Sequence, residues 1–182
     1  MEQDKGDVRV WQFELVAGEY AVPWAVKNCT LEVSAMGIVN ADASNLKEWV
    51  NLALMLFPES SFDEELALHK KILASGKEEG LLYQKNNRYV AFMNLSIRND
   101  YVNGTDTSPV VFVEALYVLP DYQRRGIGKK LIEYAENYAR QKGITQLASD
   151  CYTDNLLSES FHKNCGFVEK ERVICFVKNI ES

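Results

Sequence analysis

The feature that most constrains the fold of this chain is a long apolar run that leads through a glycine-containing turn into a segment with helical periodicity. Residues Pro109–Leu119 are apolar almost throughout, with Glu114 as the exception, and such a run suits a strand that is buried on both faces. The turn Pro120–Gly128 follows, and apolar side chains then recur at helical spacing over Gly128–Lys142. The sequence therefore predicts a strand, a tight turn and a helix at the centre of an α/β fold.

The turn itself carries the residues of an anion-binding site. Gly126 and Gly128 remove side chains from the turn. The start of a helix adds N–H groups without intrahelical partners and the positive end of the helix dipole. Arg124, Arg125 and Lys129 surround these donors with positive charge. Together these groups predict a cradle for a pyrophosphate.

Three phosphate-binding patterns compete for this segment, beside the simpler interpretation of a charged turn with two glycines at a helix start. A P-loop needs Ser or Thr where this chain has Lys130, and a dinucleotide-binding fingerprint needs Gly where it has Leu131. The pattern Gln/Arg-x-x-Gly-x-Gly/Ala after a strand fits Gln123–Gly128 at every position, and it resembles the acetyl-CoA signature of the GNAT family of N-acetyltransferases. The resemblance implies a GNAT fold, which is an α/β single domain with a mixed central β-sheet flanked by helices, and acetyl-CoA as co-substrate.

A second segment, Asn155–Phe167, resembles the GNAT pattern Asn-x-x-Ala-x-x-x-Tyr-x-x-x-Gly-Phe. The resemblance implies that Asn155 contacts the pantetheine arm of the cofactor. His162 stands where the family usually has the Tyr that protonates the departing thiolate, so His162 is a candidate general acid. A hydrogen bond to CoA and a structural position on a helix are the alternatives for His162. The expected cofactor-binding residues are Leu116, Tyr117, Val118, Gln123, Arg124, Arg125, Gly126, Ile127, Gly128, Lys129 and Asn155.

The resemblance narrows to the aminoglycoside 6'-N-acetyltransferases of one branch, and it runs from about Met36 to Ile180. It implies transfer of an acetyl group to the 6'-amine of a cationic aminoglycoside, which confers antibiotic resistance. The alternatives are a GNAT enzyme for another small polyamine or a protein amine, and a non-catalytic acyl-CoA-binding module. The segments that carry the resemblance are Ser96–Gly104, Ser108–Glu114, Val118–Pro120, Ala148–Asp150 and Glu171–Ile174.

Carboxylates supply the chemistry that a polyamine substrate needs, because they bind ammonium groups through charge-assisted hydrogen bonds. Acetyl transfer also needs a base that removes a proton from the 6'-ammonium, and Glu114 or Asp150 is the expected base. Backbone N–H groups around Tyr117 and Val118 are expected to bind the thioester oxygen. Trp49 fits either a wall of the sugar site or a core position on its helix. The expected substrate-binding residues are Asp100, Tyr101, Glu114, Asp150 and Trp49.

Residues 36–182 are expected to form one domain, and residues 1–35 an N-terminal extension of unknown role with strand-like runs at Val8–Val16, Tyr20–Val26 and Cys29–Val33. Two helices are expected early in the domain. The first is capped by Asp42 or Ser44 and ends at Pro58, and the second runs from Ser60 or Ser61 to Gly76 with Phe62, Leu66, His69 and Leu73 on one face. Further expected strands are Gly37–Asn40, Leu81–Lys85, Tyr89–Ile97, Ile144–Asp150 and Phe167–Lys178, with a last helix at Asn155–Asn164.

Composition limits the partners of the chain. The net charge of −6 argues against a nucleic-acid-binding surface and allows a cationic substrate. No segment has the ~20 apolar residues of a membrane span, so we expect a cytoplasmic protein with no membrane contact. The four cysteines and two histidines lack the spacing of a zinc site, so no metal is expected. The apolar segment Arg172–Ile180 is similar to the C-terminal strands that pack in dimers of this branch, which implies a homodimer.

Overall fold

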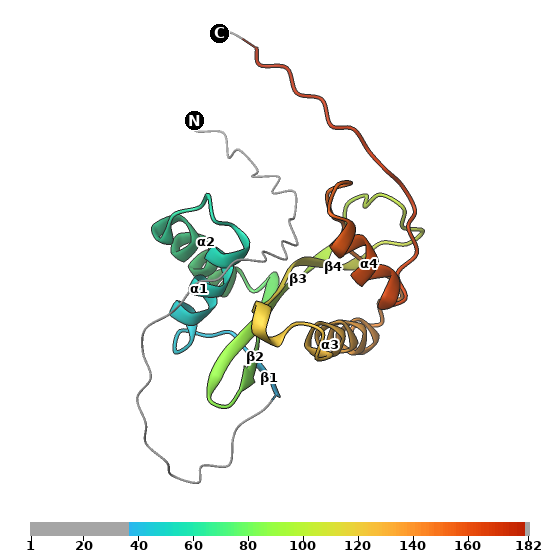
Figure 1. Cartoon of the computed structure of the whole chain (residues 1–182). Helices are drawn as coiled ribbons and strands as arrows, with labels where there is room; N and C mark the ends of the chain where they lie inside the picture. Colours follow the sequence, from blue (N-terminus) through green and yellow to red (C-terminus); the bar gives the residue numbers. More distant parts are fainter. Residues whose placement is uncertain (1–36, 181–182) are drawn as a thin grey trace.

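The computed structural model describes residues 37–180, so the strand-like runs of the N-terminal extension lie outside the described residues (Figure 1). A sheet with the order β1-β2-β3-β4-β5 forms the centre of the domain. The first four strands are antiparallel to their neighbours, and β5 is parallel to β4. The expected α/β domain with a mixed sheet is therefore confirmed. The strands are β1 (Gly37–Asn40), β2 (Glu78–Lys85), β3 (Arg88–Arg98), β4 (Val110–Val118) and β5 (Leu147–Ala148).

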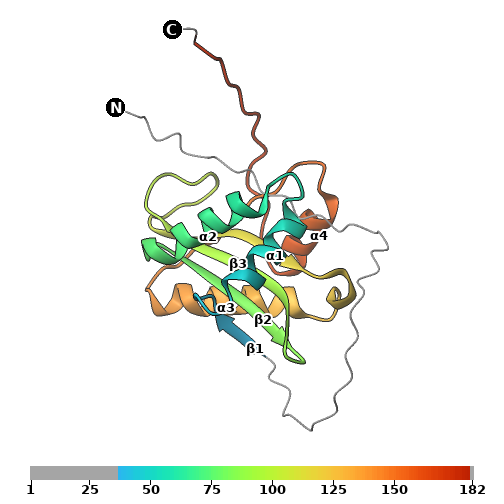
Figure 2. The same ribbon diagram turned by 90° about the vertical axis from the view of Figure 1, so that its left-hand side faces the viewer.

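Helices cover both faces of this sheet. Helices α1 and α2 lie on one side, and α3 and α4 lie on the other (Figures 1 and 2). A short 3-10 turn, η1 (Pro120–Tyr122), joins β4 to α3. The helices are α1 (Leu46–Leu56), α2 (Phe62–Ser75), α3 (Ile127–Gln141) and α4 (Leu156–Asn164). All four helices were expected, with ends that differ by a few residues at most.

Local chemistry explains the ends of α2 and the turn of the central hairpin. The Ser61 side chain and Glu64 form a reciprocal capping box at the start of α2, and Gly76 ends the helix in the left-handed region with φ 60°. Asn86 and Asn87 both have positive φ, 51° and 57°, which is the geometry of a two-residue hairpin between twisted strands.

The buried face of α2 differs from the one expected. Phe62 and Leu73 are each 37% exposed, whereas Glu65, His69 and Ile72 are buried. Of the residues expected on this face, His69 is buried and Leu66 is half-buried. In the fold the His69 ring packs edge-on against the Trp49 indole, with 4.3 Å between ring centroids, and this contact turns a polar face of α2 inward.

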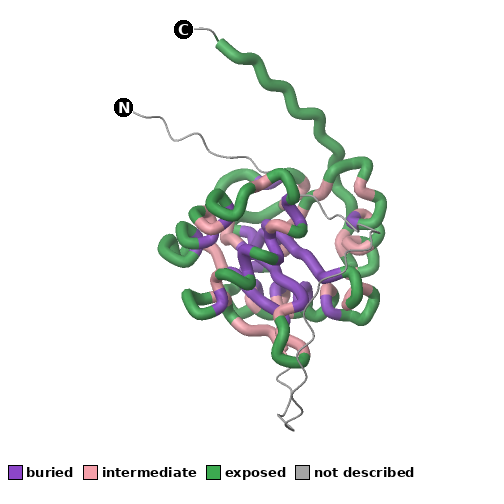
Figure 3. The backbone as a smooth tube through the Cα atoms, turned by 60° about the vertical axis from the view of Figure 1, so that its left-hand side comes forward, coloured by how far each residue is buried: buried purple, intermediate pink, exposed green. Residues whose placement is uncertain are grey.

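The core lies between the sheet and the helices, and the central strands are its most buried part (Figure 3). Every residue of β4 is buried, as expected for its apolar run. Strand β5 is much shorter than the expected Ile144–Asp150, because it pairs with β4 only at Leu147 and Ala148. This ladder ends at Phe112 and Ala148, and the site described below lies next to its end.

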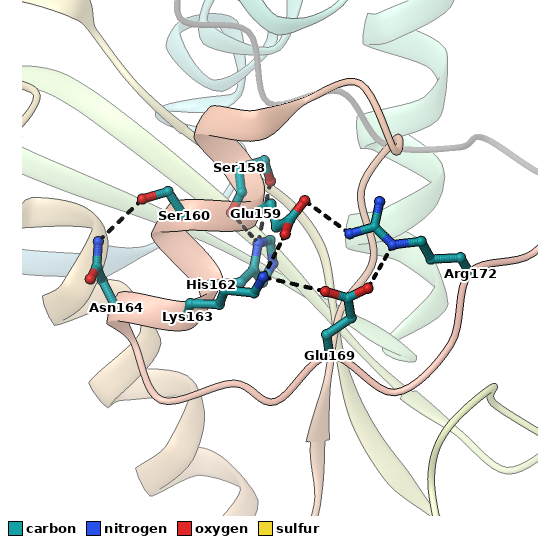
Figure 4. A network of polar contacts seen from close by, with 8 residues as sticks. All are labelled: Ser158, Glu159, Ser160, His162, Lys163, Asn164, Glu169 and Arg172. Atoms are coloured by element: carbon teal, nitrogen blue, oxygen red, sulfur yellow. Dashed lines mark hydrogen bonds and ion pairs between the residues drawn. The ribbon is translucent and has the colours of Figure 1, made fainter.

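The expected last strand, Phe167–Lys178, does not form in the single chain. Residues 167–180 have no regular secondary structure, and residues 168–180 are exposed (Figure 3). Ion pairs hold the start of this segment to α4, since Arg172 contacts Glu159 and Glu169, and Lys163 contacts the same two acids (Figure 4). Beyond Arg172 the chain leaves the domain, and none of the described strands pairs with it (Figure 1).

Candidate active site

A β-bulge in β4 places Glu114. Strand β3 pairs Asn94 with Ala115 and Leu95 with Val113, so Glu114 is the extra residue on the bulged strand. A bulge re-aims the side chain that it carries. On the other edge, β5 pairs only with Val111 and Phe112, so the ladder between the two strands ends just before Glu114.

The Glu114 carboxylate is buried, with 8% of the residue exposed, and three donors bind it. Arg98 donates from Nε to Oε1 at 2.8 Å and from Nη2 to Oε2 at 2.6 Å. The Ser96 hydroxyl donates to Oε1. A buried carboxylate is costly unless it is paired and hydrogen-bonded, and these donors meet that requirement. The expectation that Glu114 has a partner or a task therefore has a structural basis.

Two further carboxylates face the Glu114–Arg98 pair. Glu78 lies opposite Ser96 in the β2–β3 register and is half-buried. Loss of water raises the pKa of Glu78, and the negative charge of Glu114 raises it further. Asp150 follows β5 and is exposed as a residue, yet loss of water around its carboxylate raises its pKa, with a smaller raising effect from Glu114. The positive charge of Arg98 lowers the pKa of both Glu78 and Asp150.

Asp100 and Tyr101 lie in the loop between β3 and β4, a short distance along the chain from Arg98. Both residues are exposed, and Tyr101 is 77% exposed. Gln146 anchors this loop by accepting hydrogen bonds from the N–H groups of Asp106 and Thr107. The Asp100 and Tyr101 side chains are thus accessible to a ligand, and their substrate contacts remain a prediction.

Trp49 does not fit the substrate contact that we expected. Its side chain is fully buried, and its indole N–H donates to the Asn94 side-chain oxygen at 3.0 Å. The indole lies against Gly80, where any added Cβ would come within 2.2 Å of the Trp49 ring. Trp49 is therefore a core residue that joins α1 to β2 and β3, and the core alternative applies.

His162 lies on α4, and its ring forms hydrogen bonds with Ser158 of the same helix and with Ser149, the residue before Asp150. Its Nδ1 lies 2.7 Å from the Ser158 backbone oxygen, which can only accept, so the ring donates from Nδ1. Its Nε2 lies 3.0 Å from the Ser149 hydroxyl and, in the neutral ring, accepts from it. Burial lowers the pKa of His162, which favours this neutral form. The general-acid role that we expected fits this arrangement poorly, because neither ring nitrogen offers a proton to the site.

The cradle forms at the start of α3. Lys130 is the first residue to donate within the helix, from its N–H to the Gly126 oxygen at 3.1 Å. The N–H groups of Ile127, Gly128 and Lys129 precede this bond and point out of the helix start. Arg124 and Gly126 hold the turn in the left-handed region, with φ 54° and 80°. These donors and the exposed cations beside them fit the pyrophosphate of a CoA molecule.

The two glycines of the cradle have different tasks. A Cβ at Gly126 would meet open space, so glycine serves there for its positive φ. A Cβ at Gly128 would lie 2.9 Å from the Phe161 ring of α4, so glycine there allows close packing of α3 and α4. Gln123 closes the turn from the other side, because its side-chain amide donates to the Val118 oxygen at 3.0 Å.

The remaining predicted cofactor residues lie in the second half of β4 and at the start of α4. Leu116, Tyr117 and Val118 pair with β3 through Met93, Phe92 and Ala91, and the described β5 ladder does not reach them. This edge of β4 can therefore receive an extended ligand through its backbone groups. At the start of α4, the Asn155 side-chain oxygen accepts from Ser158 N–H at 3.0 Å and caps the helix.

Sequence reasoning singled out the cradle and three of the carboxylates but missed four polar neighbours. Arg98, Ser96 and Ser149 stood in segments that carried the family resemblance, yet none received a role. Glu78 had no local signal, because only the β2–β3 register brings it beside Ser96.

In the described part of the chain, no group of three or more potential metal ligands is present. Within residues 37–180 none of the helices has the length and apolar character of a membrane span.

The fold and the helix-start cradle define an acyl-CoA-dependent acetyltransferase. Residues 46–167 match the model of the acetyltransferase (GNAT) family, and the chain belongs to this family.

Relatives and solved structures place the chain more narrowly. An aminoglycoside N(6')-acetyltransferase type 1 of Acinetobacter baumannii is 38% identical over 145 residues, which are 80% of this chain and 99% of the relative. The structure of aminoglycoside N-acetyltransferase AAC(6')-Iy in complex with CoA has a TM-score of 0.77 and 35% identity, and the match covers 84% of this chain and all of the other. The same enzyme with the bisubstrate analogue CoA-S-monomethyl-acetylneamine has a TM-score of 0.76 and 36% identity, and the match covers 81% of this chain and all of that chain.

Proposed function

We propose that this chain transfers the acetyl group of acetyl-CoA to the 6'-amine of aminoglycoside antibiotics and so confers resistance to them. The observation that carries the proposal is the placement of an acidic cluster next to the end of the β4–β5 ladder, with the helix-start cradle of α3 following the end of β4. The cluster suits a substrate with several ammonium groups, and the cradle suits a CoA pyrophosphate. The curated relatives that match 80% of this chain carry this activity in their names.

The two candidate carboxylates have environments that suit different tasks. Glu114 is already bound by three donors, so it suits a fixed acceptor for a substrate ammonium. Asp150 has a raised pKa and no such set of donors around it in the described residues. A base with a raised pKa takes a proton more readily, so Asp150 is the proposed base that removes a proton from the 6'-ammonium. The neutral amine can then attack the thioester carbonyl.

The backbone and the histidine complete the proposed site. N–H groups around Tyr117 and Val118 on the free edge of β4 stabilise the negative charge that grows on the carbonyl oxygen. His162 orients the Ser149 hydroxyl between β4 and α4, where Ser149 also lies 3.4 Å from the Val113 oxygen.

Residues 36–182 are the proposed acetyltransferase domain, and residues 1–35 are the proposed N-terminal extension. The protein is proposed to act in the cytoplasm.

Turnover with acetyl-CoA tests the substrate class directly. Release of free thiol should be rapid with aminoglycosides that carry a free 6'-amine and undetectable with analogues that carry a 6'-hydroxyl. Spermidine and a lysine-containing peptide report on the polyamine and protein-amine alternatives. Thiol release with spermidine or peptide but with no 6'-amino aminoglycoside would overturn the proposed substrate, and binding of CoA without any turnover would favour a non-catalytic module.

We also propose that the chain forms a homodimer through its C-terminal segment, residues 172–180. Val173, Ile174, Phe176, Val177 and Ile180 are each 60% or more exposed, which is costly for apolar side chains in water. A second copy is the proposed partner, because pairing would supply both strand hydrogen bonds and an apolar surface.

The oligomeric state in solution checks this proposal. Wild-type protein should sediment as a dimer, and the double variant Ile174→Glu, Phe176→Glu should sediment as a monomer, because charges on both apolar positions oppose burial. Lys178→Gln, in the same segment, is the matched control and should remain a dimer. A monomeric wild type would contradict the proposal.

A further inference from the structure

Arg98 is held more firmly than an ordinary surface arginine. It lies at the end of β3, and its side chain is 34% exposed. Two of its N–H donors bind the two oxygens of the Glu114 carboxylate, which fixes the planes of both groups relative to each other. The guanidinium also stacks on Phe112, with its central carbon 3.5 Å from the ring centroid. Three contacts from one neighbouring strand, β4, therefore restrain this cation.

The surroundings of Arg98 are acidic. Glu78 reaches it from β2, Glu114 from β4 and Asp150 from the end of β5. The positive charge of Lys71, on α2, also lowers the pKa of Glu78. Arg98 thus stands between three carboxylates that come from three strands of the sheet, and its charge acts on each of them.

We propose that Arg98 is a positioning residue for acetyl transfer, which fixes the Glu114 carboxylate as an ammonium acceptor and holds a positive charge near the proposed base, Asp150. The placement follows from the sheet, because Arg98 stacks on Phe112, and Phe112 pairs with Ala148, two residues before Asp150. This inference rests on the proposed function of the site. The paired N–H donors of Arg98, its fork, fix Glu114, because a buried carboxylate without its donors would rotate or take up a proton. The positive charge of Arg98 acts on Asp150 through electrostatic attraction, which leaves the Asp150 carboxylate able to take a proton from the substrate.

The sign of the electrostatic effect follows from the surroundings of Asp150. Loss of water and the charge of Glu114 both raise the pKa of Asp150, and the charge of Arg98 opposes them. Removal of that charge should raise the pKa of Asp150 further. The base would then be protonated over a wider acidic range, and activity would be lost at a higher pH than in the wild type.

The pH dependence of kcat/KM separates the two tasks of Arg98. In Arg98→Met, which removes fork and charge, kcat/KM for the aminoglycoside should fall by about 10- to 100-fold, and its acid limb should move to higher pH. In Arg98→Lys, which keeps the charge and loses the fork, kcat/KM should fall less and the acid limb should stay at the wild-type position. The KM for acetyl-CoA should be unchanged in both variants, since the cradle lies on α3.

Arg88→Met, at the exposed start of the same strand, is the matched control and should retain the wild-type profile. Thermal melts identify any variant that fails to fold, and Arg98→Lys keeps the test available if Arg98→Met does fail. An acid limb that does not move in folded Arg98→Met, or one that moves equally in Arg98→Lys, would overturn the role of Arg98. A wild type without turnover on any aminoglycoside would instead overturn the proposed function.

Discussion

Asp150→Asn should lower kcat for a 6'-amino aminoglycoside by about 10²- to 10⁴-fold, because an amide cannot take the proton of the 6'-ammonium. The substitution keeps the size and much of the polarity of the side chain, so the fold should be retained. Asp150 lies where β4 and β5 have separated, beyond the last paired residue, Ala148, and its backbone takes no part in the described ladder. Steady-state kinetics with saturating acetyl-CoA measure the loss.

Asp154→Asn is a matched control for this prediction. Asp154 is an exposed acid in the same loop, and it stands outside the proposed machinery. It should retain wild-type kcat within about twofold, since exposed substitutions away from a site have small effects. The KM for acetyl-CoA should be unchanged in both variants. Retention of more than about a tenth of wild-type kcat in Asp150→Asn would remove Asp150 from the role of base and leave Glu114 as the remaining candidate.

The cradle could be read from the sequence because its parts are consecutive. Strand, turn and helix follow one another between Val110 and Gln141, and the groups that bind an anion are mostly backbone N–H groups of one helix start. No information about the rest of the fold is needed to bring them together. The same holds for the capping box of α2 and the Asn86-Asn87 turn, where residues within four positions of each other decide the geometry.

The acidic cluster could be predicted only in part, because it depends on strand register. Glu114 stood out as a carboxylate in an apolar strand, but its partner Arg98 is set by the β3–β4 register and by the bulge opposite Asn94. Glu78 joins the cluster through the register of another strand pair. A shift of one residue would turn each of these side chains to the opposite face of the sheet.

Two further expectations depended on features that lie outside the local sequence pattern. Trp49 fits a helical stripe in either role, and only the close approach of Gly80 shows that its indole fills the core. The strand expected at Phe167–Lys178 has the right composition, yet a strand exists only where another strand supplies hydrogen bonds. Among residues 37–180 no strand pairs with this segment, and residues 168–180 are exposed.

Gly126→Val should raise the KM for acetyl-CoA by about 10- to 100-fold, because it removes the backbone conformation on which the cradle depends. Gly126 has φ 80°, a region that costs a residue with a side chain about 1–3 kcal/mol, and a β-branched residue avoids it most strongly. The turn should relax toward negative φ and carry the N–H groups of Ile127 and Gly128 away from the pyrophosphate. A hydrogen bond to a charged group contributes about 1.5–3 kcal/mol, so the loss of one such bond accounts for this range.

Gly143→Val gives a control with the same strain at the other end of the same helix. Gly143 has φ 71°, follows the C-cap of α3 and, like Gly126, has open space where a Cβ would be added. Both variants should lose similar stability in thermal melts, but only Gly126→Val should raise the KM for acetyl-CoA, with the KM for the aminoglycoside nearly unchanged. Equal rises in both variants would mean that strain anywhere in α3 weakens cofactor binding. A rise in the KM for acetyl-CoA in Gly126→Val alone would assign the pyrophosphate to the N–H groups at the start of α3. The two glycines lie at opposite ends of the helix, and only the start carries the positive end of the helix dipole.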